Sequence, residues 1–355
     1  MRERPDVSAT VCNYNGRAYL ADCLKALVAQ TFPPRRIVVY DNASDDGSAD
    51  LVRAEFPGVE VVEMGNNLGP CVPRNRGLEE ATTEWVLQVD SDAILAPDCL
   101  ERLVEQIGSL GDVVCVMPRA LVDGDDQTIH YDGGFFHYAG VMTLRHFFQA
   151  VPTVPEACVE IDAAISMALL VRKSAVLETG GYDPDYFILF EDHDLSYRLR
   201  MRDRKILLVP RAIVRHRQGT AGISFRKGKS YPERRAYLHS RNRWMLLLRN
   251  HSMRSLILSL PGILAYEMLW LGYVVQQGLW RPWVKGKRDL FGMLPTLWSE
   301  RRVIQGRRLL PDRRLLRCQS LTHAPMVRAG FLRRAGECSI NVFLKCWWAL
   351  IRWML

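Results

Sequence analysis

The sequence predicts an α/β domain with a mainly parallel sheet flanked by helices, followed by a helical, basic C-terminal extension. Short apolar runs alternate with segments of helical periodicity through the first 90 residues, which is the pattern of right-handed βαβ units. Polar clusters follow these apolar runs. Acidic and basic residues are also divided unequally between the two halves of the 355-residue chain.

The elements of the predicted sheet follow one another at a regular pitch. Apolar runs end in turn-forming residues, and Leu20, Leu24 and Leu27 recur at helical spacing after the first run. The predicted strands are residues 8–13, 36–40, 59–62 and 84–89. Three helices are predicted: one that ends at Gln30, one at 48–54 with Ser48 as N-cap, and one at 73–81.

The charge asymmetry indicates an anionic partner for the second half of the chain. From Arg211 to Leu355 there are 28 Lys and Arg against 6 Asp and Glu, whereas the first 210 residues hold 19 and 33. Anionic lipid, a phosphate-bearing substrate and nucleic acid are the candidate partners. We expect no nucleic acid, because no nucleic-acid-binding motif accompanies the charge and the aromatic residues cluster with Leu and Ile.

Polar clusters occupy the positions where open α/β sheets bind ligands, directly after the strands. They are Asn13–Asn15, Asp41–Asp46, Asn66–Asn67 and Asp90–Asp92. Ligands bind at the carboxyl ends of such strands, so the clusters together predict a binding site. Ordinary turns also use Asn and Asp, so one cluster alone would carry no such inference.

Asp90-Ser91-Asp92 closes the apolar run from Trp85 to Val89. Two carboxylates one residue apart at a strand end can hold Mg²⁺ or Mn²⁺, and such an ion can bridge a diphosphate. The alternative is a simple turn after a strand.

Glu191-Asp192-His193-Asp194 opens a predicted amphipathic helix after the apolar run from Tyr186 to Phe190. A carboxylate beside an apolar wall can have a raised pKa and act as a general base. The alternative is charge complementarity to the helix dipole. His216 follows predicted strands at 206–209 and 212–214 and precedes Gly219–Gly222; it either completes a metal or phosphate site or has a structural role.

The ordered set of these motifs resembles family 2 glycosyltransferases, the inverting enzymes of GT-A fold, and especially the rhamnosyltransferase-like bacterial branch. The resemblance covers about residues 8–225 and more loosely 226–315. Its motifs are Thr10–Asn15, Leu20–Leu24, Gln30-Thr31, Ile37–Ser48, Asn67–Gly69, Arg74–Gly77, Asp90–Asp92, Gly180–Asp183, Phe190–Leu195 and His216.

The resemblance implies a role for each motif. Base and ribose of a nucleotide diphosphate sugar would be held by Val11, Asn13, Asn15 and Asp41, and the ribose–diphosphate path by Asn67, Gly69 and Arg74. Asp90 also contacts the diphosphate, and the Mg²⁺ or Mn²⁺ ligands would be Asp90, Asp92 and His216. Asp192 would be the catalytic base, with Glu191 beside it. One base without an enzymatic nucleophile implies single displacement, and therefore inversion.

Two segments depart from the family pattern. Pro70–Pro73 stands where small residues are usual, and Ser240-Arg-Asn-Arg-Trp244 lacks the glutamine of the Gln-x-x-Arg-Trp motif that glycan-polymerising relatives carry. The second departure favours the transfer of a single sugar.

Residues 226–355 are expected to form a membrane-interfacial helical region, beside a catalytic domain at 1–225. The segment 255–280 is long enough to span a bilayer, but Pro261, Glu267 and Gln276-Gln277 favour an interfacial helix pair. The alternative is an apolar helix packed on the catalytic domain. The tail from Ile340 to Leu355 fits a surface anchor or a docking helix equally well.

These observations predict an enzyme that moves one sugar from a UDP- or dTDP-linked donor to a membrane-proximal, possibly lipid-linked glycan acceptor in envelope polysaccharide biosynthesis. With no apolar signal region at the N-terminus and nine scattered cysteines, we expect the cytoplasmic face of the inner membrane. The alternative is a catalytically silent nucleotide-sugar-binding or scaffold protein.

Overall fold

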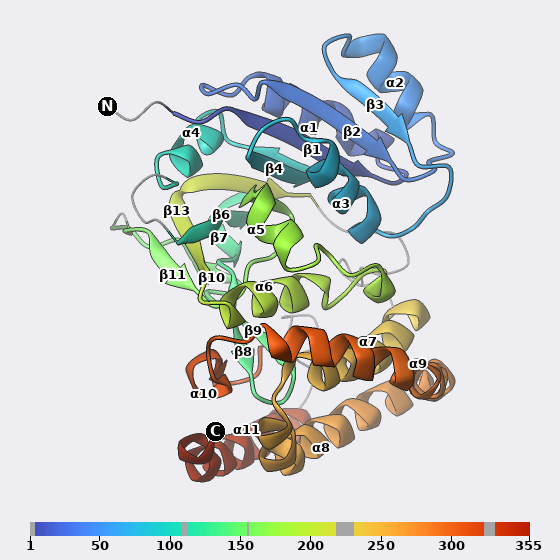
Figure 1. Cartoon of the computed structure of the whole chain (residues 1–355), viewed down its shortest axis with the longest axis vertical. Coiled ribbons are helices and arrows are strands. Elements are labelled where there is room, and N and C mark those ends of the chain that lie inside the picture. The colour runs from blue at the N-terminus through green and yellow to red at the C-terminus, as the bar shows by residue number, and fades with distance from the viewer. Residues whose placement is uncertain (1–3, 108–111, 155, 218–230, 323–330) are drawn as a thin grey trace. The chain divides into compact units, whose positions relative to one another are not determined.

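The computed structural model describes residues 4–107, 112–154, 156–217, 231–322 and 331–355 (Figure 1). The chain divides into two compact units. The first unit comprises residues 1–134, 145–199 and 204–218, and the second comprises 135–144, 200–203 and 219–355. The predicted boundary at 225/226 lies outside the described residues. The sequence does not predict that residues 135–144 belong to the second unit.

The first unit is built on one sheet whose parallel part is β3-β2-β1-β4, so the predicted α/β class is confirmed. These strands are β1 (Val7–Asn13), β2 (Arg36–Asp41), β3 (Glu60–Glu63) and β4 (Trp85–Asp90). Beyond β4 the sheet continues, mostly antiparallel, as β12 (Ala168–Arg172), β6 (Val113–Val122), β7 (Asp125–Tyr131) and β10 (Gln149–Ala150). The long strand β13 (Lys205–His216) runs parallel to β6 and also pairs with β5 (Ala93–Leu95) and β11 (Val159–Ile161).

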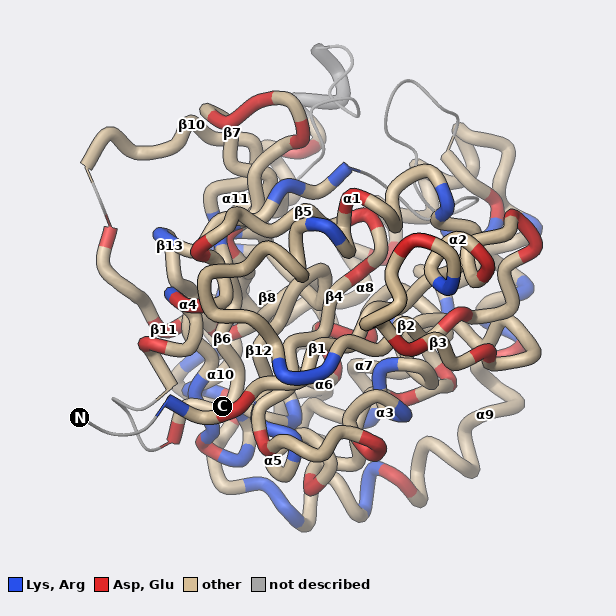
Figure 2. The backbone as a smooth tube through the Cα atoms, turned by 90° about the horizontal axis from the view of Figure 1, so that it is seen from above, with Lys and Arg blue, Asp and Glu red and all other residues tan. Residues whose placement is uncertain are grey.

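Helices cover this sheet with apolar faces that the sequence periodicity predicts. In α1 (Arg17–Val28) the side chains of Leu20, Cys23, Leu24 and Leu27 are fully buried. The other helices are α2 (Ser48–Glu55), α3 (Cys71–Glu80), α4 (Cys99–Val104), α5 (Lys173–Glu178), the 3₁₀ turn η1 (Pro184–Tyr186) and α6 (Glu191–Met201). Figure 2 shows Asp and Glu interspersed with Lys and Arg around α2, β2 and β3.

One predicted N-cap and one predicted helix start are wrong. Ser48 is the first residue of α2 and Gly47, with φ of +75°, precedes it as N-cap, because the Ser48 hydroxyl bonds to Asp46 instead of capping the helix. Helix α3 starts at Cys71, two residues before the predicted start. Pro73 fits its first turn because the N–H groups there have no partner within the helix.

Gly77 allows α3 to pack directly on the sheet. A Cβ atom at this position would lie 2.8 Å from Thr10 Cγ2 in β1 and 3.2 Å from Tyr40 Cε2 in β2. Because α3 lies this close, Arg74, one turn earlier, reaches the end of β4. The packing of α3 therefore places a buried cation at the carboxyl edge of the sheet.

The substitution Gly77→Val should lower the free energy of unfolding by about 1–3 kcal/mol, because the side chain overfills a packed contact. Urea unfolding measures this. The matched control is Glu79→Val, which introduces the same residue at an exposed position of the same helix. Its cost should stay at a few tenths of a kcal/mol, about the difference in helix propensity. Equal losses in both variants would contradict the close packing.

The second unit combines a small sheet with long helices. Its strands are β8 (Gly134–His137), β9 (Val141–Leu144) and β14 (Leu316–Arg317). Its helices are α7 (Glu233–Asn250), α8 (Met253–Gln276), α9 (Trp280–Gly306), α10 (Asp312–Leu315), α11 (Phe331–Ile351) and the 3₁₀ turn η3 (Arg352–Met354). The predicted helix pair at 255–280 is thus one helix, α8, followed by the start of α9.

Glu267 of α8 joins this helix to α7 and α9. Its carboxylate lies 2.6 Å from Arg243 Nη1 in α7 and 2.7 Å from Lys287 Nζ in α9. The indole N–H groups of Trp244 and Trp283 donate to the same carboxylate at 2.8 and 3.0 Å. Arg243 and Trp244, the Arg-Trp pair of the incomplete sequence motif, are therefore both bonded to the buried Glu267 of α8.

Candidate active site

The polar clusters that follow β1, β2 and β4 meet at one edge of the sheet, as predicted. Asn13 is in register with Asp41, and Cys12 with Asp90. The Asn13 side-chain amide donates to Asp41 at 2.7 Å. Val11 lies in the hydrophobic core with no exposed surface, so its side chain is not part of this edge.

Hydrogen bonds fix the loops that follow β1 and β2. Asp41 accepts from the Ser44 N–H at 2.8 Å, the Ser44 hydroxyl accepts from the Asn15 N–H at 2.8 Å, and Asn15 accepts from the Asp45 N–H at 2.9 Å. Asn42 donates to Asn67 and to the Gly69 carbonyl at 3.1 and 3.0 Å. Four of the predicted nucleotide-binding residues, Asn13, Asn15, Asp41 and Asn67, thus belong to one connected network.

Two glycines allow neighbouring segments to pack closely at this edge. A Cβ atom at Gly16 would lie 2.3 Å from Asn13 Oδ1 and 2.7 Å from Ser91 Oγ. Gly69, with φ of +74°, is so near Phe187 that a Cβ atom would lie 2.4 Å from its carbonyl oxygen. Sequence reasoning singles out Gly69 and misses Gly16, although the Asn15-Gly16 turn signal marks its position.

Arg74 is the cation at the centre of the acidic residues. Its Nη2 donates to Asp90 Oδ1 at 2.7 Å and to the Ser166 carbonyl at 2.9 Å. Its Nη1 lies 3.6 Å from Glu191 Oε1 and 3.8 Å from Asp192 Oδ1. One buried guanidinium therefore faces three carboxylates, and Ser166, which the sequence does not reveal, helps to orient it.

Burial changes the acidity of two of these groups. It raises the pKa of the Asp90 carboxyl to about 6, with Arg74 opposing the shift and Asp92 adding to it. Burial also raises the pKa of Glu191 well above its usual value, and Asp192 adds to this shift. A Glu191 that keeps its proton near neutral pH is a poor general base. Asp192 Oδ1 is buried and has no hydrogen-bond partner within the described part of the chain.

The backbone before α6 is held in an uncommon conformation. Phe187, Leu189 and Phe190 have φ angles of +59°, +72° and +74°. Non-glycine residues in this region cost about 1–3 kcal/mol each, and such strain is typical of functional sites. The chain enters the turn that carries Glu191 and Asp192 through this segment.

His216, at the end of β13, joins the Asp90–Asp92 cluster. Its Nε2 lies 3.3 Å from Asp92 Oδ2, and its Nδ1 lies 3.1 Å from the hydroxyl of Tyr131, which the sequence does not single out. Carboxylates and an imidazole fixed through its second nitrogen are a suitable donor set for a divalent ion. The residues present therefore fit Mg²⁺ or Mn²⁺. The glycine-rich loop 219–222 lies outside the described residues.

A second cluster contains two acids and a histidine. The carboxylate and imidazole atoms of Asp132, His146 and Glu156 lie within 4.8 Å of one another. However, Arg119 donates to Asp132 at 3.0 and 2.7 Å and also contacts Glu156. A buried guanidinium already balances the charge, so we interpret this cluster as an ion-pair network.

The chain is similar to a family model and to several curated proteins. Residues 8–173 match the model described as Glycosyl transferase family 2. The matched residues make up just under half of the chain. It is 30% identical over 126 residues to the succinoglycan biosynthesis protein ExoO of Rhizobium meliloti, covering 35% of this chain and 36% of the relative. It is 32% identical over 205 residues to the pre-mycofactocin glycosyltransferase of Mycobacterium tuberculosis, covering 55% and 40%. The chain thus spans less than half the length of these curated relatives.

Solved structures show the same GT-A-like fold. GalNAc-T7, crystallised with UDP, GalNAc and Mn²⁺, aligns with a TM-score of 0.58 and 16% identity over 83% of this chain and 58% of its own. S. aureus TarS 1–349 aligns with a TM-score of 0.51 and 15% identity over 85% and 86%. The expected GT-A class is confirmed, and the rhamnosyltransferase-like branch stays a prediction.

The substitution Arg74→Met should lower the free energy of unfolding by about 3–5 kcal/mol near neutral pH, because buried carboxylates lose their counter-charge. A carboxyl whose pKa is higher in the folded than in the unfolded chain destabilises the fold at high pH, and the penalty disappears toward about pH 4. The loss should therefore be larger at about pH 8 than at about pH 5. Urea unfolding without added metal ions measures it.

Arg76→Met is the control on the same helix, because the Arg76 side chain is 42% exposed and pairs with Glu80 four residues later. Its loss should not exceed about 0.5 kcal/mol. An Arg74→Met loss that does not change with pH would contradict the proposed carboxylate repulsion.

Proposed function

We propose that this protein is an inverting glycosyltransferase that moves one sugar from a nucleotide diphosphate sugar to a hydroxyl of a membrane-proximal acceptor. The observation that carries the proposal is that one edge of the sheet brings together a metal-binding donor set and a separate carboxylate suited to be a base. The family 2 domain supports the reaction class.

The donor side of the proposal uses the edge formed by β1, β2 and β4. The Asn13–Asp41 pair would hold base and ribose, with Asn67 and Gly69 along the ribose–diphosphate path. A bound Mg²⁺ or Mn²⁺ would be held by Asp90, Asp92 and His216 and would offset charge on the diphosphate. We propose a UDP- or dTDP-linked donor; GalNAc-T7, which shares the fold, was crystallised with UDP and Mn²⁺.

The acceptor side of the proposal depends on Asp192. Its carboxylate takes the proton of the acceptor hydroxyl, and the hydroxyl oxygen then bonds to the anomeric carbon while the bond to the nucleotide diphosphate breaks on the opposite face. The Arg74 guanidinium lies 3.8 Å from Asp192 and favours its charged form, and Glu191, which retains its proton, does not compete for this role. The single displacement inverts the anomeric centre.

Relatives support envelope polysaccharide biosynthesis as the pathway. One is the succinoglycan biosynthesis protein named above, and another is the poly-beta-1,6-N-acetyl-D-glucosamine synthase of Staphylococcus epidermidis, 23% identical over 58% of this chain and 48% of its own. The glycan acceptor would then be assembled at the cytoplasmic face of the inner membrane.

Membrane contact is proposed from an outward-facing apolar surface on the second unit. Helix α8 is the only described helix that is long and apolar enough to cross a bilayer by length and composition. Its buried Glu267 faces α7 and α9, so the helix has a protein side and a free side. We therefore propose shallow burial in the lipid interface instead of a span.

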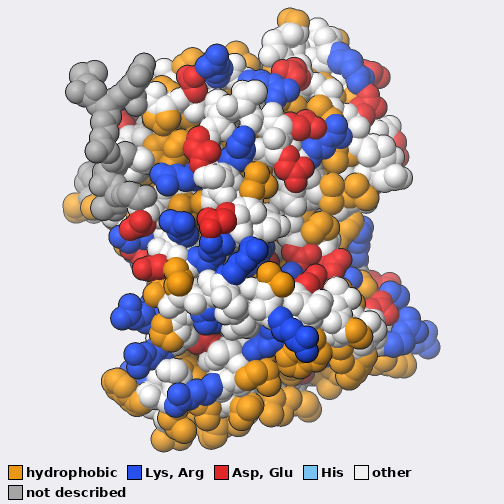
Figure 3. Space-filling model, viewed as in Figure 1, with side chains coloured by type: hydrophobic (Ala, Val, Ile, Leu, Met, Phe, Trp, Pro, Cys, Tyr) orange, Lys and Arg blue, Asp and Glu red, His pale blue; other side chains and the backbone are white. Residues whose placement is uncertain are grey.

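The free side of α8 and the end of the chain form this surface, which we call the apolar face. Along α8 the exposed residues follow helical spacing, and Trp347 of α11 donates to the Leu258 carbonyl of α8 at 2.9 Å. Figure 3 shows hydrophobic side chains gathered along the lower edge of the view. The apolar face consists of Ile257, Leu260, Leu264, Met268, Val275, Val342, Phe343, Leu350 and Trp353, each at least 41% exposed. Exposed Arg254, Lys345 and Arg352 border it.

The proposed donor chemistry predicts that one nucleoside diphosphate raises the melting temperature in the presence of Mn²⁺. The screen compares UDP, dTDP, GDP, CMP and AMP, since a ligand at 100 times its Kd stabilises the fold by about 2.7 kcal/mol. Asp92→Asn should remove the shift. Asp192→Asn should keep the shift and lower sugar transfer by about 10²–10⁴-fold.

The control is Asp185→Asn, an exposed acid that precedes the same turn; both the shift and transfer should persist. Unchanged transfer in Asp192→Asn would exclude it as the base. A nucleotide shift without transfer by the native protein on any acceptor would favour a silent binding protein.

The apolar face predicts binding to lipid vesicles. Ile257→Gln with Met268→Gln should weaken binding to vesicles about tenfold or more, since burying such side chains contributes about 1.5–3 kcal/mol each. Vesicle co-sedimentation measures this. The control, Val28→Gln with Val154→Gln, changes two exposed apolar residues of the first unit. Equal binding by both variants would contradict the assignment of the face.

A further inference from the structure

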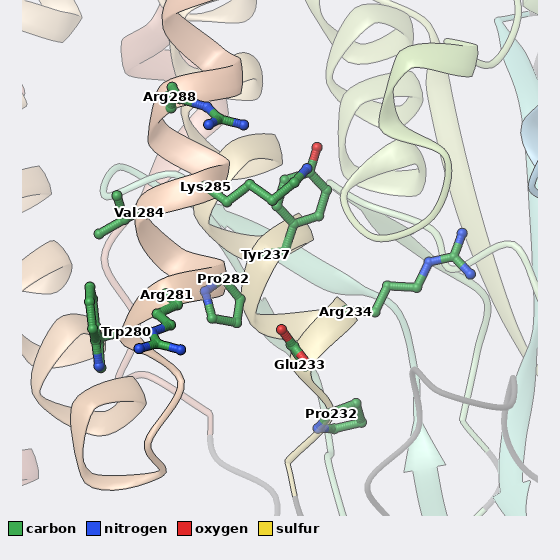
Figure 4. Close-up of a pocket in the computed structure, with 10 residues that line it drawn as sticks. All are labelled: Pro232, Glu233, Arg234, Tyr237, Trp280, Arg281, Pro282, Val284, Lys285 and Arg288. Atoms are coloured by element: carbon green, nitrogen blue, oxygen red, sulfur yellow. The ribbon is translucent and has the colours of Figure 1, made fainter.

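The second unit contains an open pocket of about 820 Å³ that the proposed chemistry does not use (Figure 4). It lies between the first turns of α7 and α9. Four basic residues and one acidic residue line it, together with an aromatic and aliphatic wall. The lining residues are Arg234, Arg281, Lys285 and Arg288, then Glu233, and Pro232, Tyr237, Trp280, Pro282 and Val284.

The pocket has an excess of positive charge. Lys285 donates to Asp289 at 2.8 Å and its ammonium lies 4.2 Å from the Tyr237 ring centre, so it is partly compensated. Arg288 is 3.4 Å from the same Asp289 carboxylate and its side chain is 76% exposed. Arg281 lies over the Trp280 ring and forms no ion pair with any residue that the structure describes. Two guanidinium groups are therefore available to an anion.

The backbone adds to this positive potential. Helices α7 and α9 both start at the pocket, and neither N-cap, Pro232 or Leu279, offers a side-chain oxygen. The first N–H groups of a helix favour anions when no side chain caps them. Gly286 allows α7 and α9 to pack closely, because a Cβ atom there would lie 2.7 Å from the Tyr237 carbonyl oxygen.

An apolar path leads to the pocket from the apolar face. The exposed stripe of α8 ends at Val275, and three residues separate α8 from Trp280 at the start of α9. Trp280 and Val284 are 50% and 46% exposed and lie on the outer side of α9, whereas Lys285 points toward Tyr237 (Figure 4). A ligand with an anionic head and a hydrocarbon chain matches both the basic pocket and the apolar path beside it.

We propose that this pocket binds the phosphate group of a lipid, a phosphate ester on a long aliphatic chain. The guanidinium groups of Arg281 and Arg288 contact the phosphate oxygens, and the chain lies along Trp280 and Val284 toward α8. The inference rests on the membrane contact proposed above, and two lipids share this chemistry. One is an anionic phospholipid of the bilayer and the other is a phosphorylated polyprenol that carries the growing glycan.

Vesicle binding by the full-length protein tests the pocket. Neutral phosphatidylcholine vesicles are compared with vesicles of equal surface charge that contain either phosphatidylglycerol or polyprenyl phosphate. Arg281→Gln with Arg288→Gln should lose about 25-fold in affinity for the anionic vesicles, roughly fivefold for each charge. Binding to neutral vesicles should be unchanged, and Arg281→Lys with Arg288→Lys should retain most of the affinity.

The control is Arg302→Gln with Arg313→Gln, which removes two exposed charges of the same unit away from the pocket lining. A loss confined to the pocket variant supports the site. Preference for polyprenyl phosphate at equal charge identifies the acceptor lipid, and equal binding of both anionic lipids identifies a bilayer headgroup. Equal losses in both variants, or no preference for anionic over neutral vesicles, would overturn the proposal. The nucleotide-dependent melting shift, measured on the same samples, reports separately on the proposed reaction.

Discussion

The candidate active site depends on one guanidinium placed among acids that would otherwise repel one another. Arg74 bonds to Asp90 and lies near Glu191 and Asp192, so it links the proposed metal-binding residues to the proposed base. Its position follows from the close packing of α3 on β1 and β2, which Gly77 permits. Residues of α3, β4 and α6 are thus linked through the positive charge of Arg74. Because the guanidinium is buried, its interactions are little screened by solvent.

Much of this arrangement could be predicted from the order of strands and the residues that follow them. Parallel strands end at the same edge, so Asn13, Asp41 and Asp90 had to be neighbours once the βαβ pattern was recognised. The approach of His216 to Asp92 was expected only from the family resemblance. The pairing of β13 with β5 and β6 brings these residues together, and a contact between residues 124 positions apart leaves no local pattern in a single sequence.

Other features escaped prediction because they depend on tertiary packing. Tyr131 orients His216 from a neighbouring strand, and Ser166 contributes a carbonyl oxygen, which any residue carries. Val11 faces the core, because alternate residues of a strand point to opposite faces of the sheet. In the second unit, Glu267 counted against a membrane span in the sequence. The structure gives the reason, since this acid has partners on α7 and α9.

The strained segment before α6 has a consequence for how this site tolerates sequence change. Three apolar residues, Phe187, Leu189 and Phe190, adopt backbone angles that glycine would adopt without steric cost. Glycine would relieve the strain, but it would also remove the bulky side chains beside the base and loosen the entry to its helix. The fold is therefore less stable here than it could be, and greater thermal stability at these positions would come with a less ordered base. Attempts to make this protein more robust should begin elsewhere in the chain.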